Sequence, residues 1–307
     1  MRFGLVVVST AVAAWMALGA NAFAQGTPAS LQAQIEAARA AEHDHSYYDA
    51  VRLWTPLAEQ GVAEAQAHLG QLYAQGQGVC KSQAKAVEWL KKAADQGFVE
   101  AFDDLGDLYS NGTGSFKDGG RALAWYQKAA DLGDARAEEA LASIYAQGEG
   151  VPVNRELSYT WLKKAVEQRR KDGDLRTASL DAFFLGAAYA DDKDDVNAAA
   201  WYLIAANMGS LEAMDELAPM YEKGVGVPRD YVQAYKWYAL LAAYDKAAGL
   251  RVGYATEVKA LKRLSAKMNA AQLQQARVLV QESKIVPIGA PPPVLTPVVR
   301  PPNCPAE

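Results

Sequence analysis

A chain of 307 residues, half of them hydrophobic, is long enough to bury a large core in one or two domains. Its formal net charge of −5 disfavours non-specific binding to nucleic acid, which needs Lys and Arg to displace counterions from phosphates.

The first residues have the pattern of an export signal. Arg2 supplies a positive charge, residues 3–19 are apolar, and residues 22–24 (Ala-Phe-Ala) form a small-x-small cleavage site. We therefore expect a signal peptide over residues 1–24, cleaved after Ala24, and a mature chain in the periplasm or outside the cell. No cysteine directly follows the cleavage site and no later run is long and apolar enough to span a bilayer, so we expect neither a lipid anchor nor a membrane-embedded protein.

The chain has two cysteines, Cys80 and Cys304. An oxidising compartment outside the cytoplasm permits a disulfide between them, and two free thiols are the alternative. Pairing cannot be deduced from the sequence, so both remain open.

Two aromatic residues recur at one period, which is the strongest pattern in the chain. Tyr73, Tyr109 and Tyr145 are 36 residues apart, and tryptophans follow at the same interval: Trp89, Trp125 and Trp161. Both series continue, with Tyr189, Tyr221, Trp201 and Trp237. Two residue types in step at one period indicate an internal repeat.

Each repeat has the pattern of two helices. In the second repeat, small and apolar residues at steps of three and four share one face of a first helix: Ala101, Leu105, Gly106, Leu108 and Tyr109. The second helix carries Ala122, Trp125, Tyr126, Ala129 and Ala130. Glycines follow both helices, which is typical of helix C-termini. The pattern predicts helical hairpins with aromatic rings packed between neighbours.

The stretch from Leu105 to Ala130, with Leu-Gly-x-Leu-Tyr, a Gly-x-Gly turn and Ala-x-x-Trp-Tyr-x-Lys-Ala-Ala, resembles the Sel1-like repeat, a relative of the tetratricopeptide repeat. The resemblance covers residues 62–245 in five units. It implies an all-α fold, a right-handed α-α solenoid, and a role as a scaffold or adaptor for a protein partner, with no cofactor.

The flanking regions are predicted to cap the array. Residues 25–61 form an N-terminal capping helix region, in which residues 50–61 match a second helix alone. Residues 246–286 form C-terminal capping helices at about 255–267 and 270–284, the second with a capping-box-like start at Asn269. Residues 287–307 are Pro-rich and predicted to be a disordered tail.

The fourth repeat departs from the others. Its Gly-x-Gly turn is replaced by residues 191–195 (Asp-Asp-Lys-Asp-Asp), and a charged insertion, Glu167–Ser179, precedes it. We expect a lengthened helix and a protruding loop there. The loop is either a docking element or a drifted surface connection, since loops tolerate insertion.

The resemblance also implies where a partner would bind. In tetratricopeptide repeats, certain positions of the first helix line a concave face, and their equivalents here include Glu64, Gln71, Glu100, Asp103, Asp107, Glu139, Phe183, Glu212, Asp215 and Glu222. We expect an acidic groove that attracts a basic segment, with an apolar spot at Leu180 and Phe183. Exposed carboxylates contribute mainly steering and specificity. A solvated, solubilising face is the alternative.

Candidate catalytic residues are few. Ser82 and Lys85 match Ser-x-x-Lys, the nucleophile motif of penicillin-recognising enzymes, but Ser-Asp-Asn and Lys-Thr-Gly are absent. A cell-wall or β-lactam hydrolase is thus the alternative to a scaffold. His43 and His45 lack an identifiable third metal ligand and are interpreted as solvated, so no metal site is predicted. The periodic aromatics are interpreted as core rather than as a carbohydrate-binding surface. We expect a monomer.

Overall fold

In the computed structural model, the described residues are 28–249, 251–283 and 285. Over these residues the chain forms fourteen α-helices and one short 3-10 helix, without a strand. The all-α prediction is therefore confirmed, and the chain is divided into two compact units at residues 104 and 105, within one helix.

The first unit stacks its helices in chain order. Helix α2 packs on α3, α3 on α4, and α4 on α5. Their bounds are α2 Pro28–His43, α3 Tyr47–Glu59, α4 Ala63–Gln75 and α5 Gln83–Ala94, and α6 Val99–Ser110 contains the division between the units. Helices α2 and α3 form a complete hairpin ahead of the first repeat, of which the sequence motif identified only α3.

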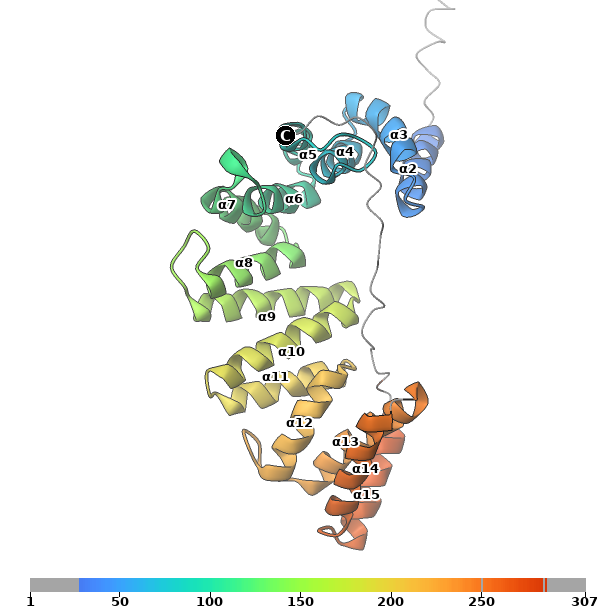
Figure 1. The fold of residues 1–307 in the computed structure, drawn as a ribbon, viewed down its shortest axis with the longest axis vertical. Helices are drawn as coiled ribbons and strands as arrows, with labels where there is room; N and C mark the ends of the chain where they lie inside the picture. The colour runs from blue at the N-terminus through green and yellow to red at the C-terminus, as the bar shows by residue number, and fades with distance from the viewer. Residues whose placement is uncertain (1–27, 250, 284, 286–307) are drawn as a thin grey trace, which may run out of the picture. The chain divides into compact units, whose positions relative to one another are not determined.

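The second unit continues the same plan. Each helix from α7 to α13 packs on the next in the chain, and α15 packs back on α13 (Figure 1). The elements are η1 Gly114–Phe116, α7 Gly119–Asp131, α8 Ala135–Gln147, α9 Arg155–Asp172, α10 Leu175–Asp191, α11 Asp195–Asn207, α12 Leu211–Lys223, α13 Tyr231–Ala248, α14 Arg251–Ser265 and α15 Ala270–Glu282. The last two correspond to the predicted C-terminal helices, and Asn269 and Gln272 form the expected capping box.

Glycines end the first helices in the predicted way. Gly76, Gly148 and Gly224 adopt left-handed C-cap conformations after α4, α8 and α12, which residues with a Cβ resist. The second glycine of two of these turns is required because no Cβ would fit there. A Cβ on Gly78 or Gly226 would clash with the backbone carbonyl of the residue that starts the preceding second helix, so the turn packs directly on that helix.

Small residues in the first helices make room for the rings of the second helices. A Cβ on Gly106 would meet the ring of Tyr126, and one on Gly186 would meet the ring of Tyr202, so each tyrosine ring lies flat across its partner helix. Trp54 and Trp237 are fully buried. Trp89, Trp125 and Trp161 are each covered by a lysine three residues later, at 4.0, 4.0 and 3.8 Å from the ring centroid. The aromatics are therefore packing residues.

The charged insertion before the fourth repeat forms no protruding loop, and that prediction was wrong. Helix α9 runs on to Asp172 and α10 begins at Leu175, so residues 167–179 lengthen both helices. Between them lie only Gly173, which is left-handed, and Asp174, whose side chain accepts a hydrogen bond from the backbone N–H of Thr177. A strong C-cap followed by a strong N-cap folds the insertion back as a helical hairpin.

Candidate partner-binding site

In the first unit, most of the predicted partner-facing groups already bind within the chain. Glu64 on α4 accepts from Arg39 on α2 at 2.6 Å, and Gln71 donates to Asp104 at 2.7 Å. Asp103 is 3% exposed and therefore faces inward. Glu100 is exposed. Of the four predicted groups in this unit, Glu100 alone offers an exposed carboxylate.

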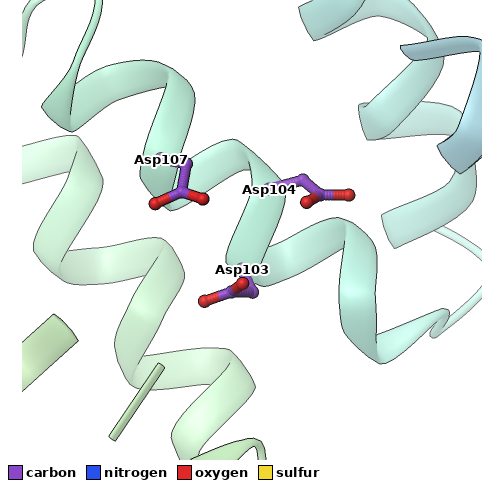
Figure 2. Close-up of side chains that lie close together, drawn as sticks. All are labelled: Asp103, Asp104 and Asp107. Carbon is purple, nitrogen blue, oxygen red and sulfur yellow. The ribbon is translucent and has the colours of Figure 1, made fainter. Parts of the chain in front are cut away.

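Three aspartates gather on one turn of α6 (Figure 2). Asp103, Asp104 and Asp107 can each bring one carboxylate oxygen within 4.8 Å of the others. Asp104 is held by Gln71, as above, and Asp107 accepts from the hydroxyl of Tyr126 at 2.7 Å. The cluster is explained by bonds to neighbouring helices.

Two further predicted carboxylates of the second unit are paired. Glu139 on α8 binds Arg169 of α9 at 2.6 Å. Glu222 at the end of α12 binds Arg263 of α14 through two hydrogen bonds, at 2.8 and 2.6 Å. These hydrogen bonds, first of all that from Arg263, lower the pKa of the Glu222 carboxyl. Both glutamates therefore hold helices together.

An exposed acidic patch remains on α12. We define it as Glu212, Asp215 and Glu216, which are all exposed. Glu212 accepts a hydrogen bond from the Ser210 hydroxyl at 3.1 Å. Neither Asp215 nor Glu216 forms an ion pair with any side chain that the structure describes. In the second unit, Glu212 and Asp215 of this patch are thus predicted acidic residues that remain exposed, and Glu216 adds a carboxylate that was not predicted.

Helix α10 carries an exposed apolar stripe beside it. Leu180 is 46% and Phe184 52% exposed, one turn apart on the helix. Phe183 is half-buried and its ring lies 5.7 Å from that of Tyr202. Phe183 thus packs inward on Tyr202 and is not part of the exposed stripe. The exposed ring is that of Phe184, which was not among the residues predicted from the sequence.

A signal for Phe184 was present in the repeat. At its position the other first helices have His68, Asp104, Ala140 and Glu216, and at the position of Leu180 they have Glu64, Glu100, Arg136 and Glu212. The fourth repeat alone is apolar at both. Burial first, and then the charges of Glu216 and Asp191, raise the pKa of Tyr202 to about 12, so Glu216 of the α12 acidic patch acts on the ring that packs on Phe183.

Beneath the surface, α10 contains a buried charge. Asp181 is 1% exposed and pairs with Arg169, which is 6% exposed and also binds Glu139. At the position of Asp181 the other first helices have alanine: Ala65, Ala101, Ala137 and Ala213. Arg169 stands where shorter second helices end on a glycine, as at Gly97, Gly133 and Gly209. The two exchanges compensate each other, because a buried charge needs a partner.

The other predicted residues have structural roles. The Ser82 hydroxyl caps α5 by accepting from the backbone N–H of Lys85, whose ammonium lies 5.0 Å from the centre of the Tyr73 ring. This geometry provides no activated serine. Cys80 is disulfide-bonded, but Cys304 lies outside the described residues, so their pairing stays a prediction. His43 ends α2 with an exposed side chain.

His68 has a partner that the sequence did not indicate. Its ring stacks on the indole of Trp54 at 4.6 Å, and its Nδ1 lies 2.9 Å from a carboxylate oxygen of Glu42. The same carboxylate accepts from the Trp54 indole N–H at 3.0 Å. These contacts fix α2 on the first repeat.

Comparison with known proteins identifies the repeat. The family model for the Sel1 repeat matches residues 63–98, 103–134, 135–169, 179–210 and 211–243. A Sel1 repeat protein from Oxalobacter formigenes is 32% identical, with 66% of this chain and 82% of that chain covered and a TM-score of 0.54. A protective antigen of uropathogenic Escherichia coli is 28% identical over 77% of this chain and 56% of its own, with a TM-score of 0.38.

A putative Sel1 repeat protein from Klebsiella pneumoniae is 22% identical, with 69% and 97% of the two chains covered and a TM-score of 0.38. Among curated proteins, none matches. Within the described part of the chain, every helix is too short or too polar to cross a membrane. The family model and the Oxalobacter formigenes protein thus identify the repeat as the kind that the residues predicted.

Proposed function

The chain belongs to the Sel1 repeat family, whose members are generally scaffolds for protein–protein interaction, and from this premise we propose that it is an exported adaptor that binds a basic polypeptide segment. The binding site in this proposal is the α10 apolar stripe, Leu180 and Phe184, together with the α12 acidic patch. The partner segment presents an apolar side chain to the stripe and basic side chains to the patch.

The observation that carries this proposal is that α10, alone among the first helices of the repeats, is apolar at both of these exposed positions. An exposed phenylalanine and leucine one turn apart cost solubility and add nothing to the core, so a partner that covers them explains their presence. Binding energy at interfaces is concentrated in such anchors, whereas exposed carboxylates at the rim contribute steering and specificity.

The proposed location rests on the sequence. Residues 1–24 have the charge, the apolar run and the cleavage site of a signal peptide, and they lie outside the described residues. We place the mature chain in the periplasm of a Gram-negative bacterium, where the envelope supplies its partner. Detection of a mature N-terminus at Gln25 by N-terminal sequencing of the native protein tests this placement.

The binding proposal is tested with the mature chain as bait, first in envelope extract and then with the purified captured protein. Replacing Leu180 and Phe184 by glutamate gives α10 the residues that the fifth repeat has at these positions, Glu212 and Glu216, without disturbing the core of α10. We expect the double variant to weaken binding by at least about tenfold, since each anchor loses its buried apolar area. Binding by the unchanged chain should also weaken as salt is raised, because the α12 patch acts through charge.

Val196→Glu is the matched control. Val196 is 66% exposed on α11 of the same repeat, so the variant exchanges an exposed apolar residue for one glutamate on a different helix. It should bind as the unchanged chain does. Equal loss in the control and the double variant, or binding insensitive to both salt and the double variant, would overturn the proposed site.

A further inference from the structure

The helices at the C-terminus repeat the plan of the junction between the third and fourth repeats. Shifting the numbering by 76 residues superimposes Trp161 on Trp237 and the left-handed Gly173 on Gly249. Helices α9 and α13 are both 18 residues long and start at equivalent residues. Helix α14 therefore occupies, relative to α13, the place that α10 has relative to α9.

The same shift aligns the charged groups of the two junctions. Glu139, Arg169 and Asp181 correspond to Asp215, Asp245 and Glu257. In the first junction the arginine bridges the half-exposed Glu139 and the buried Asp181. In the second junction the central residue is a third acid, so the two outer carboxylates have no cation between them.

The geometry around Glu257 is consistent with a missing cation at the place that Arg169 occupies in the first junction. Glu257 is 6% exposed, and its Oε2 is buried without a hydrogen-bond partner in the described part of the chain. A Cβ on Gly253 would clash with a carboxylate oxygen of Asp245, and Gly253 lies one helical turn before Glu257. The Asp245 carboxylate thus lies against the face of α14 that carries Glu257. Asp215 is exposed and gives access from solvent.

The electrostatics point the same way. Burial raises the pKa of Glu257, and the charges of Asp245 and Asp215 and a side-chain hydrogen bond with Asp245 raise it further. The nearby Arg263 is held by two hydrogen bonds from its guanidinium to Glu222. A buried carboxylate surrounded by acids is costly unless a cation joins it.

We propose that Asp215, Asp245 and Glu257 form a receptor for one arginine side chain of the partner polypeptide. The guanidinium would bridge Asp215 and Glu257 as that of Arg169 bridges Glu139 and Asp181. Arginine fits because its planar fork of donors binds two carboxylates at once, which a lysine ammonium does with less geometric match. The inference rests on the proposed role as a polypeptide-binding adaptor and assigns the partner a buried arginine.

The experiment uses small probes on the mature chain, so it does not require the native partner. Nα-acetyl-arginine amide, Nα-acetyl-lysine amide and calcium chloride are each titrated, with binding followed by amide chemical shifts and by the thermal midpoint. The arginine probe should bind at least several-fold more tightly than the lysine probe. Glu257→Gln should weaken arginine binding by at least about tenfold.

Two further variants make the test independent of folding defects. Asp215→Asn changes an exposed residue and should also weaken arginine binding. Asp245→Arg supplies the missing cation from within the chain, so its thermal midpoint should rise and its response to the arginine probe should disappear. Glu282→Gln, an exposed change on α15, is the control and should behave as the unchanged chain does.

Equal binding of arginine and lysine, a response to calcium alone, or undiminished arginine binding by Glu257→Gln would each overturn the receptor. The proposed adaptor function fails differently. If the captured partner still depends on Leu180 and Phe184 while Glu257→Gln binds it normally, the adaptor stands and the arginine receptor falls. If the arginine probe binds as expected but no captured partner depends on the α10 stripe, the arginine site stands and the proposed adaptor site on α10 falls.

Discussion

The junction α8–α9–α10 and the junction α12–α13–α14 share a backbone plan and treat charge in opposite ways. In the first, a buried arginine neutralises a buried aspartate and an exposed glutamate. In the second, three carboxylates occupy the equivalent places, and the Oε2 of Glu257 is buried without a hydrogen-bond partner in the described part of the chain. The same helix geometry therefore accommodates either a cation that pairs with the buried carboxylate or a third acid in its place.

Helices α10 and α12 also differ in which residues they bury and which they expose. Helix α10 has a charged residue in its core and apolar residues outside, whereas α12 buries Met214 and Leu217 and exposes Glu212, Asp215 and Glu216. The two helices are neighbouring first helices of one array. A partner that crosses both meets an apolar anchor and then an acidic surface, which is the basis of the proposed recognition.

The largest effect is expected from removing the arginine that closes the first junction. Arg169→Met leaves Asp181 buried without a cation, and the free energy of unfolding should fall by about 3–5 kcal/mol. Urea unfolding followed by circular dichroism measures this change. Asp245→Met at the equivalent position removes an acid from an acidic site, so it should cost little or increase stability.

A double variant tests the explanation of that loss. Asp181→Ala combined with Arg169→Met restores the alanine found in the other repeats and removes both charges. It should recover most of the lost stability, because a buried ion pair can be replaced by apolar residues at little cost. A double variant as unstable as Arg169→Met alone would show that packing by the arginine stem, and not charge, closes the junction.

The repeats themselves could be predicted from the sequence because packing imposes a period on Trp, Tyr and Gly. Burial of Asp181 could not, since one aspartate in a helical pattern is read as a surface residue. The same holds for the predicted groove residues: Glu64, Glu139 and Glu222 lie at surface positions, but their partners come from other helices. Sequence periodicity identifies a face, not the contacts across it.

The helical turn inside the insertion has a counterpart elsewhere in the sequence. Gly173 and Gly249 lie at the same distance from Trp161 and Trp237, so the region after the fifth repeat already contained the pattern of a lengthened hairpin. Comparing the insertion with that region, rather than with the shorter repeats, would have predicted a turn at Gly173. The hairpin α2–α3 lacked the motif in its first helix, so only packing revealed it.

A second difference between the junctions gives a pH-dependent effect of intermediate size. Glu138 on α8 is 6% exposed and corresponds to Met214 on α12. Burial raises the pKa of Glu138 to about 7. Since the folded state holds the proton more tightly than the unfolded state, this glutamate lowers stability as pH rises from about 4.5 to about 7.

Glu138→Gln should therefore be more stable than the unchanged chain at pH values above about 7, by about 1–3 kcal/mol, with the gain vanishing toward pH 4. Urea unfolding across this pH range measures it. Glu222→Gln is the control of opposite sign, because hydrogen bonds from Arg263 and Lys267 lower the pKa of Glu222. Its stabilising contribution is present at neutral pH and lost on acidification. A pH-independent gain in Glu138→Gln would contradict burial of an ionised carboxylate.

The smallest effect concerns the plan that the junctions share. Gly173 and Gly249 both end a long second helix in the left-handed conformation, with φ of 80° and 73°, and a Cβ on either meets nothing within 4 Å. Alanine at each position should then cost only the backbone strain, about 1 kcal/mol, and the two losses in thermal unfolding should match. Unequal losses would mean that the two turns differ in the contacts they carry. Equal losses for the two alanine variants would show that the junctions share a backbone conformation. Opposite effects of Arg169→Met and Asp245→Met on stability would show that the junctions differ in their charges.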